Sequence, residues 1–233
     1  LKAMMERILG ASPYQSPTDM GVNMAGLAIC DDEAVCDAAR MEIVRRYFSA
    51  CVNAKRTGCG ADQVSKLKML MKQAGVTPDL SPIRAAALAK EEATGKPAGA
   101  LMLPNGEVIS GRTSTRLGAA SSLLLNALKY LAGIPEETYI ISNEAIDPIC
   151  HLKTELLHSK NPRLHPDEML IALSLSSATE PLAARAIEAA EQLRGCDAFF
   201  SVIISSADEK LYRTLGINVS CEAKYERSSY YHK

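Results

Sequence analysis

Residues 98–110, Ala-Gly-Ala-Leu-Met-Leu-Pro-Asn-Gly-Glu-Val-Ile-Ser, mark the place where the spacing of apolar residues along this chain changes. The pair Asn105-Gly106 stands between two short apolar runs, and this dipeptide is a strong signal for a two-residue β-hairpin turn. We therefore predict a hairpin with strands over 98–103 and 107–110.

The part of the chain before Gly95 shows the residue spacing of amphipathic helices instead. Helices are predicted over 2–9, 31–55, 61–74 and 81–94. A glycine follows each of them at once or within a few residues, as is common at helix ends. Pro82 occupies the favoured first position of the last helix. These predictions define a helical subdomain over 1–94.

Beyond residue 95, predicted helices and strands alternate. The predicted helices cover 117–131, 143–157, 167–174, 181–193 and 207–215, and the predicted strands cover 138–142, 196–205 and 219–225. Such alternation is typical of a layered α/β domain, which we place over 95–233.

Composition indicates a globular protein without a bulk electrostatic partner. The chain has 233 residues, 47% of them hydrophobic and 23% charged, which allows a sizeable core in one or two domains. A formal net charge of -1 favours neither nucleic acid nor a membrane as partner.

The seven cysteines form no Cys-x-x-Cys pair and are expected to be reduced thiols. No apolar run approaches the ~18 residues of a membrane span, so we expect a cytoplasmic protein. The chain opens in a helical pattern without an initiator Met, which favours the later part of a longer protein.

Three polar segments, over 12–26, 110–118 and 161–168, share one design. Each places hydroxyls, a charged residue and Gly or Pro in a turn directly before an apolar helical run. Backbone N–H groups at a helix start lack partners and carry partial positive charge, so they bind phosphates and carboxylates. The three segments together predict an anion-binding pocket at helix N-termini.

Segment 110–118, Ser-Gly-Arg-Thr-Ser-Thr-Arg-Leu-Gly, is the first candidate. Its glycine permits a tight turn, and Thr113, Ser114 or Thr115 is predicted to cap the next helix. Arg112 offers a bidentate fork to an anion, although a structural salt bridge explains this arginine about equally well. The segment is not a Walker loop, because the Gly-Lys-Ser/Thr ending is missing. Asn126, inside the following apolar helix, is expected to tie down a neighbouring loop or to line the pocket.

Segment 161–168, Asn-Pro-Arg-Leu-His-Pro-Asp-Glu, supplies Arg163 as an anion ligand and His165 with Glu168 as catalytic candidates. The helix dipole alone explains Asp167 and Glu168, because carboxylates are favoured in a first helical turn. Two potential metal ligands are weak support for a metal, and we assign none. The chain lacks the His-x-Glu and Pro-Cys-x-x-Cys signatures of zinc deaminases and the Gly-x-Ser-x-Gly elbow of serine hydrolases.

Segment 12–26 contributes Ser16, Thr18 and Asn23 as anion-binding candidates and Asp19 as a catalytic candidate. Asn23 comes four residues after Asp19, so both side chains are expected on one helix face. A simple helix cap would explain Thr18 and Asp19 but not Asn23.

Four stretches carry a resemblance to a known family. They are Ser12-Pro-Tyr-x-Ser-Pro-Thr-Asp-Met-Gly-Val-Asn-Met-Ala-Gly, Gly111-Arg-Thr-Ser with its Leu-Gly-Ala-x-Ser-Ser continuation, Asn161-Pro-Arg-Leu-His-x-Asp-Glu and Leu215-Gly-Ile-Asn-Val. Through them essentially the whole chain resembles the C-terminal half of bacterial domain-of-unknown-function family 1846, the UPF0371-type proteins. The resemblance implies a helical subdomain followed by a three-layer α/β/α subdomain with a mixed sheet, in a cytoplasmic homo-oligomer. It also implies a preceding half with a Gly-Pro-Gly-Ser-Gly-Lys segment similar to a phosphate loop, and it implies no particular reaction.

Our leading hypothesis is the C-terminal part of a nucleotide- or phosphate-using enzyme. The absent half would bind a nucleotide with Mg²⁺, while Arg112, Thr113, Ser114, Arg163 and His165 would face a small anionic substrate. A non-catalytic anion-binding or regulatory module and an oligomer-assembly domain are the alternatives.

Overall fold

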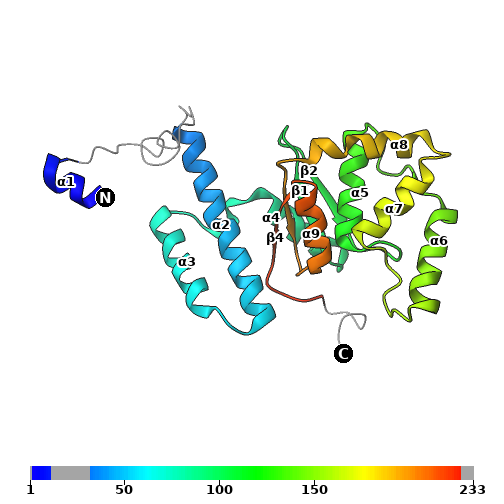
Figure 1. The fold of residues 1–233 in the computed structure, drawn as a ribbon, viewed down its shortest axis with the longest axis horizontal. Helices are drawn as coiled ribbons and strands as arrows, with labels where there is room; N and C mark the ends of the chain where they lie inside the picture. Colours follow the sequence, from blue (N-terminus) through cyan, green and yellow to red (C-terminus); the bar gives the residue numbers. More distant parts are fainter. Residues whose placement is uncertain (1, 12–31, 227–233) are drawn as a thin grey trace.

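The computed structural model describes residues 2–11 and 32–226 (Figure 1). The helices that precede the sheet are α1 (Lys2–Leu9), α2 (Asp32–Thr57), α3 (Ala61–Ala74) and α4 (Pro82–Thr94), with a 3₁₀ turn at Pro78–Leu80. Gly75 and Gly95 end α3 and α4 with φ angles of 65° and 63°, in the left-handed region that glycine adopts without steric cost. The predicted helical N-terminal region is confirmed.

A mixed sheet follows, and its four strands within the described residues run in the order β2-β1-β3-β4. The strands are β1 (Ala98–Met102), β2 (Val108–Arg112), β3 (Asp197–Phe200) and β4 (Asn218–Cys221). β1 pairs antiparallel with both β2 and β3, whereas β3 and β4 are parallel and joined through helix α9. The predicted hairpin is confirmed, with Gly106 at φ 85° in its turn.

Alternate residues of the strands face two different helical layers. Ala100 and Phe199 pack with Phe48 and Ile83 of α2 and α4, whereas the adjacent strand residues pack against the opposite helices. α4 lies against β1, β2 and β3. The protein is thus of the α/β class with helices on both sides of the sheet, and the predicted division at residue 95 stays a prediction.

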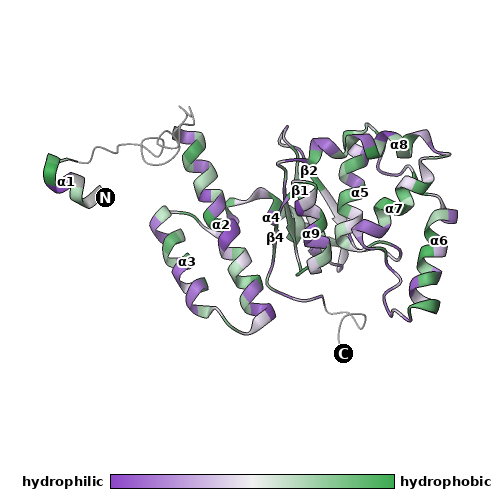
Figure 2. Ribbon diagram, in the orientation of Figure 1, coloured by the Kyte–Doolittle hydropathy of each residue, from purple (hydrophilic) through white to green (hydrophobic). Residues whose placement is uncertain are grey.

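The other layer is built from helices that come later in the chain. They are α5 (Ala119–Leu131), α6 (Asn143–His151), α7 (Pro166–Ser176), α8 (Pro181–Glu188) and α9 (Ser206–Thr214). A π-helical turn, Leu152–Leu156, continues α6, and a 3₁₀ turn, Ala189–Leu193, continues α8. Figure 1 shows α6, α7 and α8 on the far side of α5 from α2 and α3. Figure 2 shows that α5 is largely apolar and the neighbouring α9 more polar. Most residues of α5 are buried, whereas α9 buries only Asp208 and Tyr212.

Three strand predictions need correction. The strand predicted over 219–225 is β4, which already ends at Cys221. Residues 138–142 form no strand, because no neighbouring strand pairs with them. Ile140 packs into the core from an irregular stretch, while Tyr139 is 95% exposed. The strand predicted over 196–205 ends at Phe200, since the chain then turns into Ser205, the N-cap of α9. An apolar run alone cannot tell a strand from a buried loop.

Gly111 has a different purpose from the tight turn expected of it. It lies inside β2, and a Cβ added there would stand 2.4 Å from the backbone nitrogen of Leu123 in α5. Only glycine therefore lets α5 lie this close to the strand. None of the described helices is long and apolar enough to cross a bilayer.

Candidate functional site

A cavity of about 570 Å³ lies where β3 ends and where α5, α7 and α9 begin. Its walls come from residues 118–121 at the start of α5, from residues 161–165, from the β3–α9 connection over 202–206, and from residues 225 and 226. Ligands of open α/β sheets commonly bind beyond the carboxyl ends of parallel strands, which is where this cavity lies.

Two of the predicted polar segments meet at this cavity. Leu164 donates its N–H to the Arg116 carbonyl at 2.8 Å, and Gly118 donates to the Leu164 carbonyl at 3.3 Å. The Ser121 hydroxyl, which is fully buried, donates to the same carbonyl at 2.6 Å. Segments 110–118 and 161–168 therefore form one unit although they are far apart in the sequence.

This pairing changes how α5 begins. Gly118, rather than Thr113, Ser114 or Thr115, is the N-cap of α5, and no side chain caps the helix. The Ser114 hydroxyl instead accepts hydrogen bonds from Arg116 and Leu117 inside the turn. The predicted hydroxyl cap is wrong because the extended stretch that pairs with Leu164 separates these residues from the helix.

Because no side chain caps α5, the backbone N–H groups of its first turn remain available to a ligand. The N–H groups of Ala119, Ala120 and Ser121 have no acceptor among the described residues, and all three residues line the cavity. These N–H groups form the partly positive end of a helix. This part of the cavity wall is suited to an anion.

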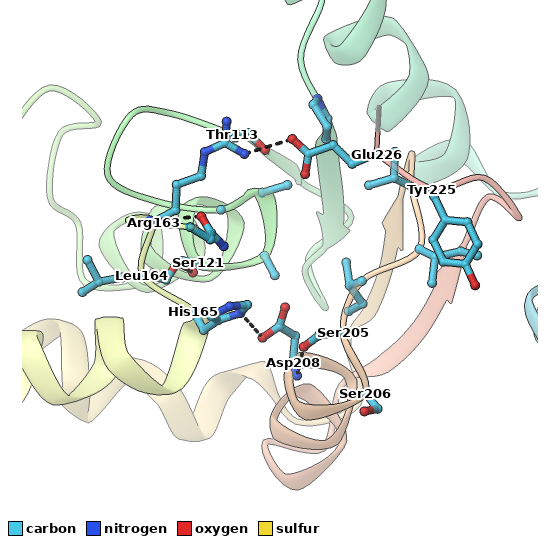
Figure 3. A pocket seen from close by; sticks show the side chains of 18 of the residues that line it. Thr113, Ser121, Arg163, Leu164, His165, Ser205, Ser206, Asp208, Tyr225 and Glu226 are labelled. Atoms are coloured by element: carbon cyan, nitrogen blue, oxygen red, sulfur yellow. Dashed lines mark hydrogen bonds and ion pairs between the residues drawn. The ribbon is translucent and has the colours of Figure 1, made fainter. Parts of the chain in front are cut away.

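The His165 ring lies within hydrogen-bonding distance of a buried carboxylate at the cavity. Its Nδ1 lies 3.0 Å from Oδ1 of Asp208, which is only 8% exposed (Figure 3). The Asp208 N–H is itself bonded to the Ser205 hydroxyl, the cap of α9, at 3.0 Å. The hydrogen bond from the imidazole to Asp208 raises the pKa of His165, although burial opposes this shift. The geometry turns Nδ1 toward Asp208 and leaves Nε2 for other partners.

Thr113 and Arg163 line the same cavity beside Glu226 (Figure 3). Arg163 Nη1 lies 2.9 Å from Glu226 Oε1, and both side chains are largely buried. Thr113 is only 2% exposed, yet its hydroxyl forms no hydrogen bond with any described residue. Since none of the described residues has a fully buried side-chain oxygen or nitrogen without a partner, this hydroxyl is accessible from the cavity and can bond to water or to a ligand group there.

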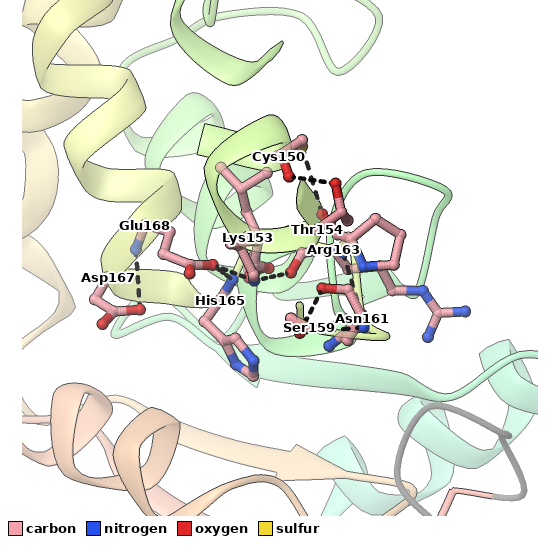
Figure 4. A network of polar contacts seen from close by, with 12 residues as sticks. Cys150, Lys153, Thr154, Ser159, Asn161, Arg163, His165, Asp167 and Glu168 are labelled. Atoms are coloured by element: carbon pink, nitrogen blue, oxygen red, sulfur yellow. Dashed lines mark hydrogen bonds and ion pairs between the residues drawn. The ribbon is translucent and has the colours of Figure 1, made fainter. Parts of the chain in front are cut away.

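A buried lysine that does not line the cavity fixes the segment around His165 (Figure 4). Lys153, in the π-helical turn after α6 and 7% exposed, donates to Glu168 Oε2 at 2.6 Å and to the Arg163 carbonyl at 2.5 Å. The same Glu168 oxygen accepts the His165 N–H at 2.7 Å. Glu168, predicted as a catalytic residue, does not line the cavity and instead fixes the backbone on which His165 stands.

Sequence reasoning missed Asp208 and Lys153. Asp208 resembles an ordinary first-turn carboxylate of its helix, and Lys153 resembles one more charge on a mixed helix face. Only the cap signal Ser205, three residues before Asp208, was readable, and it does not point to His165.

Several predicted site residues lie elsewhere. Arg112 is exposed at the end of β2 and donates to the Thr113 carbonyl at 3.4 Å; neither Arg112 nor Ser114 lines the cavity. Asn126 ties down a strand, as one reading predicts, by donating to the Ser110 carbonyl at 2.9 Å. The remaining candidates, Ser16, Thr18, Asp19 and Asn23, lie outside the described residues.

Metal and thiol chemistry find little support within residues 2–11 and 32–226. No group of three or more His, Cys, Asp or Glu residues there is placed to hold a metal ion. The six cysteines of this part are free thiols, and burial raises the pKa of Cys221 to about 12, which disfavours its reactive thiolate.

Comparison with known proteins identifies relatives along the whole chain. The family model "Domain of unknown function DUF1846, C-terminal" matches residues 79–231, and its N-terminal counterpart matches residues 1–75. UPF0371 proteins of Corynebacterium efficiens and Corynebacterium diphtheriae are 49% and 47% identical over 233 residues. A UPF0371 protein of Streptococcus thermophilus is 45% identical over the same length. These matches cover 100% of this chain but 47% of each relative, so the chain spans about half their length. The chain belongs to the DUF1846 family.

Proposed function

We propose that the cavity binds a small anionic molecule carrying phosphate or carboxylate, and that His165 transfers a proton to or from it. The observation that carries this proposal is the His165–Asp208 pair, 3.0 Å apart, at a cavity where three helices begin. The chain would then be the C-terminal part of a nucleotide- or phosphate-using enzyme.

Anion binding is supported by several donors that converge on the cavity. The open N–H groups at the start of α5 and the unpaired Thr113 hydroxyl face it without a competing acceptor among the described residues. Arg163 and Arg56 add positive charge, although each is engaged, with Glu226 and with Glu209 respectively. An anionic ligand would have to bond to these guanidinium groups while the carboxylates stay bound. A ligand with correctly placed oxygens can do this better than a simple salt ion.

Proton transfer is supported by the way in which Asp208 holds the imidazole. A histidine fixed through Nδ1 presents Nε2 in one orientation, and a neighbouring carboxylate stabilises the imidazolium. The raised pKa of His165 means that the ring is protonated at higher pH than a free histidine. His165 is therefore suited to act as a general acid, or to donate a hydrogen bond to a leaving oxygen.

The remaining parts of the proposal concern the longer proteins. Since the chain spans about half of its relatives, a nucleotide with Mg²⁺ would be held mainly by the part of those proteins that this chain lacks. We further propose a cytoplasmic homo-oligomer whose partner is the small anion rather than nucleic acid or membrane, in keeping with a net charge of -1. Binding without chemistry is the alternative, favoured by the fact that both cavity arginines are already paired.

Isothermal titration of the 233-residue chain with inorganic phosphate and with fructose 6-phosphate tests the proposal. Both probes should bind, and the advantage of the wild type over His165→Gln should shrink as the pH rises through the pKa of His165. The phosphate group ionises in the same pH range, but equally in both proteins, so the comparison isolates the histidine. The matched control is His151→Gln, which replaces an exposed histidine on α6 that does not line the cavity and should leave binding unchanged.

Absence of binding by both probes refutes the anion site. Binding without phosphate release from ATP or fructose 6-phosphate by a full-length relative would favour the non-catalytic alternative. A stable oligomer that binds neither probe would favour the assembly domain.

A further inference from the structure

A second hollow adjoins the cavity at its Arg163–Glu226 side. Its volume is about 670 Å³, and it shares Thr113, Arg163 and Glu226 with the first cavity, together with Pro97, Val202 and Tyr225. The two hollows are therefore neighbouring parts of one cleft, with the ion pair at their junction.

Thr113 stands at this junction with its hydrogen-bonding capacity unused. The residue is 2% exposed and borders both hollows, and no hydrogen bond joins its hydroxyl to a described residue, so the hydroxyl is accessible from the cleft. A hydroxyl both donates and accepts, so it can bond to whatever connects the two hollows.

The second hollow adds positive charge at its outer end. Lys96 is exposed and forms no ion pair among the described residues, and Lys224 Nζ lies 2.6 Å from Glu91 Oε2. The ammonium groups favour an anion at this end. When ionised, Glu226 at the junction of the two hollows only accepts hydrogen bonds, so the middle of a ligand should offer it donors.

We propose that the ligand spans both hollows and has two anionic groups separated by hydroxyl-bearing carbons, as in a sugar or nucleoside bisphosphate. The first anionic group lies at the start of α5 beside His165, and the second lies at Lys96 and Lys224. Thr113 and Glu226 bond to the hydroxyls between them. This inference rests on the proposed anion site and names the class of its ligand.

The test compares matched ligands by isothermal titration of the 233-residue chain. Fructose 1,6-bisphosphate is compared with fructose 6-phosphate, and adenosine 3′,5′-bisphosphate with AMP, so that the two arms separate sugar from nucleoside bisphosphates. At least one bisphosphate should bind about ten-fold more tightly than its monophosphate. Lys96→Gln should weaken that bisphosphate about three- to five-fold, the size expected of one solvent-exposed charge pair, and should leave the monophosphate unchanged. Lys68→Gln, at an exposed lysine on α3 that lines neither hollow, is the control for loss of one positive charge.

Each result decides between the two inferences. A bisphosphate preference that Lys96→Gln reduces and Lys68→Gln does not supports the two-part ligand. Equal binding of mono- and bisphosphates, or an equal effect of both lysine variants, overturns it and leaves the anion site standing. If no probe binds at all, the anion site itself is refuted, and the two-part ligand with it.

Discussion

Replacing Thr113 with Val should stabilise the ligand-free protein. Thr113 is 2% exposed and its hydroxyl borders the cavity. No side-chain oxygen or nitrogen of the described residues is both fully buried and without a partner, so only part of the cost of about 1–3 kcal/mol for a buried unpaired group applies to this hydroxyl. Valine has nearly the same shape and removes that part of the cost. Because the hydroxyl borders a cavity that water can enter, we expect about 0.5–1 kcal/mol of added stability, or a Tm about 1–4 °C higher.

The same variant should bind anions more weakly. Loss of a hydrogen bond to a charged group costs about 1.5–3 kcal/mol, which corresponds to roughly ten-fold or more in Kd for fructose 6-phosphate. Urea unfolding and isothermal titration measure the two effects separately. Thr115→Val, an exposed position in the same turn, should change stability by less than about 0.5 kcal/mol and should not alter binding. A Thr113→Val protein that is destabilised by 1 kcal/mol or that binds fructose 6-phosphate normally would refute this reasoning.

Three further predictions concern the frame of the site. Gly111→Ala should destabilise the protein by about 3 kcal/mol or prevent folding, because its Cβ would stand 2.4 Å from the α5 backbone. Gly118→Ala is the control, since a Cβ there would lie 3.8 Å from its nearest neighbour, and thermal unfolding should show that it is tolerated. Lys153→Met should cost about 2–3 kcal/mol in urea unfolding, since it leaves a largely buried carboxylate unpaired. Asp208→Asn should lower the pKa of His165, followed by NMR titration. The raised pKa in the wild type makes folding more favourable near pH 6 than near pH 8, and this difference should vanish in the variant; its persistence would assign it to another group.

Local signals were sufficient for much of the fold. The helices before residue 95 were predictable because glycine ends and helical spacing are both local properties, and the Asn105-Gly106 turn located the hairpin. The false strand over 138–142 shows where such signals stop, since a strand exists only when another strand pairs with it.

The candidate site divides in the same way. Residue type and a position before a helix were sufficient to single out Thr113, Arg163 and His165, which line one cavity. Arg112 is also a cationic residue in a polar segment before a helix, yet it does not line the cavity. It is the last residue of β2, where its side chain is exposed. Local sequence thus singles out polar residues in the turns before helices, but neither the exact helix start, as Gly118 shows for α5, nor the side chains that line the cavity.

The sequence by itself determined the class of the fold and most of its helices, because these depend on neighbours a few positions away. The tertiary structure alone decided that His165 meets Asp208, 43 residues later, and that Lys153 holds the His165 backbone through Glu168. It also decided that segments 110–118 and 161–168 pair through Leu164. Such contacts form only when the packing of distant helices on one sheet brings their ends together, and no local pattern records that packing.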